Sequence, residues 1–334
     1  MNTQLSRLVS LLKGSGVGLL VVLVSGITLA TEVACQGSRL RRLPGVAVVA
    51  GPSPPVYVTS ILGIQVPLAV GVAPDGSRLY VAEGEGDRTV RVIDLSNQAP
   101  LGTLSPPGTE PGTRKPMGVA VAPSGVVYVV DRLRSVVDLY SPAGQWLGTL
   151  ADPPQVSGAW QPLGVAVNAE GKVYVTNGSV RGRAVAGYDV QGRFVSAYGT
   201  ISEGAATGVS YPAGMALGQN GNMFVSDSNH SRIAVLNQEG DIVASYGGSV
   251  GNESLALPRG IFIDRRGFLY VTDAPSHIVK VWDASQEPAK YLFSFGEPGS
   301  ADGQLLYPNA VAVDSRGRIY VTDTGNDRIQ IWAY

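Results

Sequence analysis

The sequence has one cysteine and two histidines among its 334 residues. A disulfide within the chain is therefore excluded, because it needs two cysteines. A zinc site needs about three protein ligands of nitrogen, sulfur or oxygen type, and the chain has neither a cysteine cluster nor a His-x-His pair. No serine, histidine and acid can be chosen by their spacing as a catalytic triad, and no glycine-rich phosphate loop is present.

Charge is also scarce. Charged residues make up 15% of the chain, and 25 Lys and Arg against 26 Asp and Glu give a net charge of −1. Proteins that bind nucleic acid usually carry a basic field over one face or domain. We therefore expect no nucleic-acid partner.

What the sequence does have is 43 glycines and a repeat that begins at a proline. The intervals between successive prolines are 49, 46, 50, 46 and 50 residues, which is the range of propellers and solenoids. The prolines are Pro67, Pro116, Pro162, Pro212, Pro258 and Pro308. A glycine lies nine residues after each proline, and an acid or its amide ends the second apolar run. These acids and the amide are Glu83, Asp131, Asn177, Asp227, Asp273 and Asp323.

Each copy has the pattern of four short strands. In the last copy, Val311-Ala-Val is followed by a turn, by Ile319-Tyr-Val-Thr and by Arg328-Ile-Gln-Ile-Trp. A fourth strand ends at glycine in the earlier copies, for example Gly199 and Gly247. No helical periodicity interrupts the pattern. The sequence predicts an all-β protein, a six-bladed β-propeller of four-stranded antiparallel blades.

The sixth copy stops at Tyr334 after three strands. Val58-Thr-Ser-Ile-Leu-Gly63 has the spacing and final glycine of a fourth strand. We predict that this N-terminal segment closes the ring and covers its last sheet edge. The propeller domain is thus expected to span residues 56–334.

The run from Pro308 to Ile329 resembles the NHL repeat, and Pro212 to Ile233 matches it in part. The resemblance covers roughly residues 56–334 and implies a six-bladed propeller. Such propellers serve as binding platforms, sensor domains and, less often, enzymes, so the resemblance implies no single function. Propeller lyases related to this family use several metal-binding histidines around the channel, whereas this chain has only His230 and His277.

Residues 1–35 lie outside the repeats. Arg7 and Lys13 precede eighteen uncharged residues, 14–31, which is typical of a secretory signal peptide or a membrane anchor. Cys35 follows this stretch after three intervening residues and resembles the lipid-modified cysteine of bacterial lipoproteins. Lipidation at Cys35, an uncleaved anchor and cleavage after Ala30 all stay open. Each alternative exports the propeller and places it on the extracytoplasmic side of the membrane.

Residues 36–55 contain arginine, glycine and a Pro-rich run, and we predict that they form a tether. In up-and-down blades, the loop before each proline and the loop between the second and third strands share one face. On that face we select residues that break the repeat or add positive charge. The candidates are Arg132, Arg134, Arg181, Arg183, His230, Arg259 and His277.

Arginine recognises carboxylate and phosphate groups. Arg259 is notable because most other copies have an apolar residue after the proline. The expected partner is a protein or an acidic small molecule or polymer. A second pattern is predicted to be structural: an acid with an arginine five residues later. Its examples are Asp227 with Arg232, Asp323 with Arg328 and Glu83 with Arg88.

We therefore expect a non-catalytic binding or assembly module displayed at the cell envelope, with no cofactor. The alternatives are a metal-dependent propeller enzyme, a lyase or lactone hydrolase, and a structural subunit of an envelope complex. Calcium also stays open, because Glu83, Glu85 and Asp87 present alternating carboxylates.

Overall fold

The computed structural model describes residues 19–24, 27–32, 52–154, 159–204, 206–248 and 250–334. The chain divides into two units, residues 1–51 and 52–334. In the first unit, β1 (Leu19–Val24) pairs antiparallel with β2 (Ile27–Glu32). The described residues include no helix that is long and apolar enough to cross a membrane. Cys35 and tether residues 36–51 lie outside the described residues.

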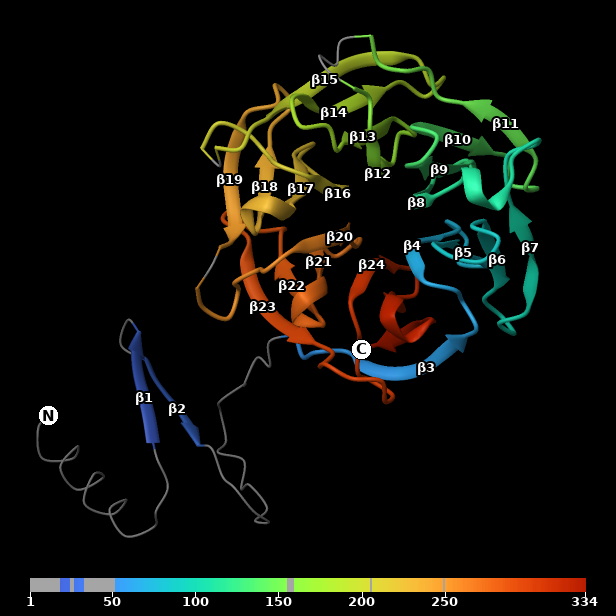
Figure 1. Cartoon of the computed structure of the whole chain (residues 1–334). Helices are drawn as coiled ribbons and strands as arrows, with labels where there is room; N and C mark the ends of the chain where they lie inside the picture. Colours follow the sequence, from blue (N-terminus) through green and yellow to red (C-terminus); the bar gives the residue numbers. More distant parts are fainter. Residues whose placement is uncertain (1–18, 25–26, 33–51, 155–158, 205, 249) are drawn as a thin grey trace, which may run out of the picture. The chain divides into compact units, whose positions relative to one another are not determined.

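The second unit is a ring of six four-stranded antiparallel sheets, which confirms the predicted fold (Figure 1). Blade 1 comprises β4 (Pro67–Val72), β5 (Arg78–Glu83), β6 (Val90–Asp94) and β7 (Pro100–Leu104). Blade 2 comprises β8 (Pro116–Val121), β9 (Val127–Asp131), β10 (Val136–Tyr140) and β11 (Trp146–Thr149). Blade 3 comprises β12 (Pro162–Val167), β13 (Val173–Asn177), β14 (Gly182–Tyr188) and β15 (Phe194–Ile201).

The remaining blades repeat this order. Blade 4 comprises β16 (Pro212–Leu217), β17 (Met223–Asp227), β18 (Arg232–Leu236) and β19 (Ile242–Gly247). Blade 5 comprises β20 (Pro258–Ile263), β21 (Phe268–Asp273), β22 (Ile278–Asp283) and β23 (Lys290–Phe295). Blade 6 comprises β24 (Pro308–Val313), β25 (Ile319–Asp323), β26 (Arg328–Ala333) and β3 (Val56–Leu62). Short 3₁₀ helices are η1 (Pro111–Thr113), η2 (Ser228–His230), η3 (Ala274–Ser276) and η4 (Thr324–Asn326).

Ring closure occurs as predicted. β3 pairs antiparallel with β26, from Val56 opposite Ala333 to Leu62 opposite Arg328. Tyr57 packs edge-on against Trp332, with ring centroids 6.0 Å apart. β3 therefore covers the sheet edge that the last three strands leave open.

The core lies between the sheets. Each of the six junctions between neighbouring blades holds a cluster of buried apolar side chains. At the junction that closes the ring, Tyr320 of blade 6 packs with Val70 and Leu79 of blade 1. Stability of this kind comes from stacking apolar sheet faces that cannot be buried within one blade.

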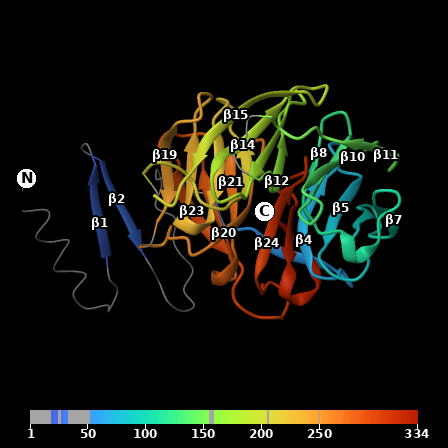
Figure 2. The same cartoon turned by 45° about the horizontal axis from the view of Figure 1, so that its top comes forward.

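The innermost strands come very close to one another, and β24 lies beside β4 along the channel (Figure 2). A Cβ atom on Gly260 of β20 would lie 2.5 Å from Ala310 Cα and 2.6 Å from Asn309 O of β24. Glycine at position 260 is therefore needed for the backbones of β20 and β24 to meet. The same strands bulge after the proline, and Thr272 Oγ1 there accepts a hydrogen bond from the Gly260 amide (2.9 Å).

Candidate binding face

Successive strands of a blade run in opposite directions, so the propeller has two faces. We call the face with the loops before each proline (the lead-in loops) and the loops between second and third strands the loop face. The hairpin turns between first and second and between third and fourth strands form the turn face. The channel between the innermost strands is a cavity of about 1120 Å³.

The repeated acid at the end of each second strand anchors the lead-in loop. Asp323 Oδ1 accepts the Leu306 amide at 2.6 Å, and Asp227 Oδ1 accepts the Ser210 amide at 2.7 Å. In blade 3, Asn177 Oδ1 performs the same role for Gln161 at 3.0 Å. All six of these side chains are buried. Their recurrence is therefore explained by loop anchoring.

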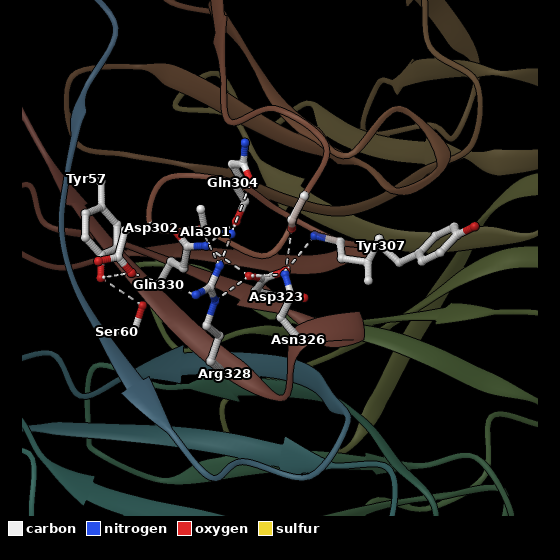
Figure 3. A network of polar contacts seen from close by, with 12 residues as sticks. Tyr57, Ser60, Ala301, Asp302, Gln304, Tyr307, Asp323, Asn326, Arg328 and Gln330 are labelled. Carbon is white, nitrogen blue, oxygen red and sulfur yellow. Dashed lines mark hydrogen bonds and ion pairs between the residues drawn. The ribbon is translucent and has the colours of Figure 1, made fainter.

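In blade 6 this acid is the centre of a polar network (Figure 3). Asp323 Oδ2 accepts hydrogen bonds from Arg328 Nε (2.7 Å) and Gln330 Nε2 (2.9 Å). Arg328 Nη2 also donates to the carbonyl oxygens of Ala301 (2.8 Å) and Gln304 (2.9 Å). The predicted pairing of the acid with an arginine five residues later is confirmed here. It is also confirmed in blade 4, where Arg232 Nε donates to Asp227 Oδ2 at 2.8 Å.

In blade 1 the same prediction is wrong. Arg91 Nη2, not Arg88, pairs with Glu83 Oε1, at 2.8 Å. The strand register places Ala82 opposite Val90, so Thr89 occupies the position that an arginine occupies in blades 4 and 6. Arg88 belongs to the turn before the strand, with a φ of 46°. Arg91 lies two residues beyond Thr89 on the same side of the strand and supplies the charge.

Three of the predicted site residues have partners within their own blade or its lead-in loop. Arg134 forms ion pairs with Asp138 (2.6 Å) and Asp131 (3.7 Å). Burial raises the pKa of Asp138, and hydrogen bonds from Trp146 and Arg134 oppose that shift. The guanidinium therefore compensates a buried carboxylate.

The other two members of this group hold loops in place. Arg183 lies in β14 and donates to the Ala197 carbonyl from Nε (3.2 Å) and Nη2 (2.7 Å). His230 lies between Asp227 Oδ2 (2.9 Å from Nδ1) and the Glu203 carbonyl (2.8 Å from Nε2). Both side chains connect neighbouring segments of the chain.

The loops between second and third strands of blades 2 and 3 are different. Leu133 is 54% exposed and Val180 is 89% exposed. Arg132 Nη2 reaches across to Gln161 Oε1 of blade 3 at 2.8 Å. The exposed Arg181 guanidinium has no partner within the described part of the chain. We call Arg132, Leu133, Val180 and Arg181 the blade 2–3 patch.

A second group lies on the loop face of blades 4 to 6, and two of its members, Tyr211 and Arg259, line the channel. Arg259 is half-buried, and its guanidinium lies over the Tyr211 ring, 5.5 Å from the centroid. His277 Nδ1 accepts the Tyr307 amide (2.9 Å), and the two rings are 4.6 Å apart. Tyr211, Tyr307 and His277 all have φ between 50° and 60°, which is rare for residues other than glycine.

Comparison with known proteins agrees with this geometry. The family model of the NHL repeat matches residues 305–332, which cover blade 6 from the end of its lead-in loop into β26. The ring has six blades of the same pattern. The protein is a six-bladed β-propeller with an NHL repeat in blade 6.

Solved structures similar to this NHL propeller have diverse roles. One is hydrazine synthase of Kuenenia stuttgartiensis, with 13% identity and a TM-score of 0.58 over 88% of this chain and 99% of that one. Another is a streptogramin B lyase, with 15% identity and a TM-score of 0.57 over 84% and 88%. A third comes from a nidogen/laminin complex, with 17% identity and a TM-score of 0.55 over 70% and 81%. At these identities the likeness shows the fold alone.

Glu83, Glu85 and Asp87, the candidate ligands for calcium, lie in different environments in the propeller. Glu83 is buried and accepts hydrogen bonds from Arg91 (2.8 Å) and the Gln65 amide (3.1 Å), whereas Glu85 and Asp87 are exposed. Among the described residues, no three His, Cys, Asp or Glu side chains converge in a way that could hold a metal ion.

Sequence reasoning missed the apolar and aromatic members of both groups, because it selected for charge. Leu133 and Val180 could have been found as single large apolar residues inside polar loops, in Arg-Leu-Arg and Ser-Val-Arg. Tyr211 and Tyr307 each precede the proline of a blade. That aromatic pair was visible in the repeat alignment but carries no charge.

Proposed function

We propose that this NHL propeller is a non-catalytic binding and assembly module whose protein partner docks on the blade 2–3 patch. The observation that carries the proposal is the exposure of Leu133 and Val180 beside Arg132 and Arg181 on adjacent loops. Exposure of large apolar side chains to water is unfavourable, and their burial beneath a partner is favourable. The neighbouring positive charge favours a partner surface with acidic side chains around an apolar centre.

A protein partner fits this patch better than a small ligand. None of its four residues lines the channel cavity, and three of them, Leu133, Val180 and Arg181, are exposed on the surface, whereas small ligands are usually bound in concave pockets. The residues belong to two loops whose backbone amides donate to buried side chains: the Leu133 amide donates to Asp131, and the Ser179 amide donates to Asn177. A partner would therefore meet loops that are already ordered, which lowers the entropic cost of docking.

The proposal also includes display at the cell envelope. The uncharged stretch 14–31 and Cys35 would direct export and attachment, and residues 36–55 would hold the propeller away from the membrane. If Cys35 carries the anchor, Cys35→Ser should release the full chain from the membrane fraction. Retention of that variant in membranes would favour an uncleaved anchor instead.

The docking surface is tested by affinity capture from cross-linked membranes of cells that express the full chain. Val180→Asp on the loop face is compared with Val190→Asp in the turn before β15 of the same blade, where valine is also exposed (51%). We expect the native chain and Val190→Asp to recover the same partner, and Val180→Asp to lose at least about ten-fold of it. Equal recovery by the two variants would contradict docking on this patch.

A further inference from the structure

The residue after the proline occupies an equivalent place in all six blades, where the channel opens on the loop face. These residues all line the cavity: Leu68, Met117, Leu163, Ala213, Arg259 and Asn309. Four are apolar. Arg259 is half-buried, and its guanidinium has no ion pair or hydrogen bond within the described part of the chain. Partial burial of a cation without a counter-ion opposes folding, so the fold does not explain this arginine.

No carboxylate of the channel wall can serve Arg259. The acids that line the cavity are Glu170, Asp264 and Asp314, and all three lie in turns at the opposite end. Asp264 is held by its neighbour Arg266, and Asp314 is held by an arginine of its own turn. The loop-face end of the channel therefore has a positive charge that nothing on the wall neutralises.

Asn309 adds a hydrogen-bond acceptor beside this cation. The close contact of Gly260 with the Asn309 carbonyl shows that Arg259 and Asn309 lie on neighbouring strands at the same level. Asn309 Nδ2 donates to the Leu68 carbonyl, and this bond leaves its Oδ1 available to accept. Behind both side chains, the wall is formed by valine, alanine, isoleucine and glycine of the inner strands.

We propose that this end of the channel, the Arg259 mouth, binds a small carboxylic acid. The guanidinium would take the carboxylate, since its fork of N–H donors matches two oxygens. Asn309 Oδ1 would accept a hydroxyl or N–H next to the carboxylate, and an apolar body would lie between the inner strands. The Tyr211 ring supports the guanidinium from one side. The Arg259 mouth shares no residue with the blade 2–3 patch, so either site can fail without the other.

The test is isothermal titration of the purified full chain with 2-hydroxyisocaproate and with its uncharged amide. The critical variant is Arg259→Leu, because leucine occupies the equivalent position in blades 1 and 3. The matched control is Arg265→Ser, which removes the same charge from the other end of the same channel. Serine is the natural residue at that place in blade 6, at position 315. Melting temperatures check that both variants fold.

We expect the acid to bind at least about ten-fold more tightly than the amide, and Arg259→Leu to abolish that preference. Arg265→Ser should keep the native affinity within about two-fold. Arg259→Leu should not lower the melting temperature, because it removes a half-buried unpaired cation. Isocaproate, which lacks the hydroxyl, should bind more weakly than its hydroxy analogue. Equal binding of acid and amide, no binding of the acid at about 10 mM, or equal losses in the two variants would overturn the proposal.

Discussion

The buried acid of blade 6 gives a direct test of why the repeat keeps an acid at this place. We predict that Asp323→Asn lowers the free energy of unfolding by about 3–5 kcal/mol, the usual cost of removing one charge of a buried ion pair and leaving the other unpaired. Asp323 is fully buried, and Arg328 is 7% exposed. Oδ2 accepts Arg328 Nε at 2.7 Å and Gln330 Nε2 at 2.9 Å. An asparagine amide nitrogen cannot accept these hydrogen bonds, so two buried donors lose a partner.

The magnitude follows from the individual contacts. A hydrogen bond to a charged group contributes about 1.5–3 kcal/mol, the bonds from Arg328 and Gln330 to the Asp323 carboxylate are both of this kind, and the remaining buried charge adds its own cost. The hydrogen bond that Asp323 Oδ1 accepts from the Leu306 amide can persist in the variant, because an asparagine oxygen also accepts. The substitution therefore removes the arginine brace and keeps the loop anchor.

The measurement is urea denaturation followed by tryptophan fluorescence, since Trp332 is buried at the same junction. A double-mutant cycle with Arg328→Met isolates the pair, and we expect a coupling energy of at least about 1.5 kcal/mol. The mirror change is Asn177→Asp in blade 3, where Ala184 takes the place of the arginine opposite the amide. Asn177 Nδ2 donates to the Arg183 carbonyl (3.1 Å), which a carboxylate cannot do.

Asn177→Asp should therefore cost about 1–3 kcal/mol near pH 7, because it buries an unpaired charge. A loss below about 1 kcal/mol for Asp323→Asn, with no coupling to Arg328, would refute the assignment of the pair as a structural brace. Equal tolerance of Asn177→Asp and Asp323→Asn would refute it as well.

Three further predictions concern packing, pH and closure. Gly260→Val should cost about 3 kcal/mol or more by forcing two inner strands apart, while Gly112→Ala, with open space around it, should change the melting temperature little. Burial raises the pKa of Asp314, but the hydrogen bonds that it accepts within its turn lower the pKa by more. The net result is a pKa below the ordinary 3.8. The stability it adds is thus fully present above about pH 4 and is lost as the pH falls through the lowered pKa, so the deficit of Asp314→Asn in urea melts should be smaller at acidic pH than at pH 7. Deleting residues 56–63 should abolish cooperative thermal unfolding, and the same segment fused after Tyr334 through an Asn-Gly turn should restore it.

Most of the fold could be predicted because each repeated residue satisfies a local backbone requirement. The proline starts the inner strand, and the glycine nine residues later takes positive φ in the first hairpin, as Gly317 does at 82°. Counting strands then placed the closing segment, since a blade with three strands leaves one edge unpaired. These requirements are short-range, so a sequence pattern can carry them.

The site was less predictable because its properties depend on contacts between distant segments. Arg88 lies at the expected offset from Glu83, but the strand register gives the pairing to Arg91. Likewise, Arg134 breaks the repeat, and the sequence alone does not show that it compensates Asp138 on the next strand. A fixed offset along the chain identifies a partner only when the loop between the two residues keeps its length.

Departure from the repeat is therefore not sufficient evidence of function in a propeller. It must also be known whether the departing residue already has a partner within the chain. Arg183 departs from the repeat, yet its guanidinium donates two hydrogen bonds to the Ala197 carbonyl, which gives it a structural role in blade 3. Arg259 departs equally, but within the described chain its guanidinium has a cation–π contact with the Tyr211 ring and no hydrogen bond or ion pair, at a position that is apolar in four blades. Because the six blades share one backbone plan, each blade serves as a control for the others. A charged residue that its equivalents do without, and that lacks a counter-ion in its own blade, is best explained by something outside the chain.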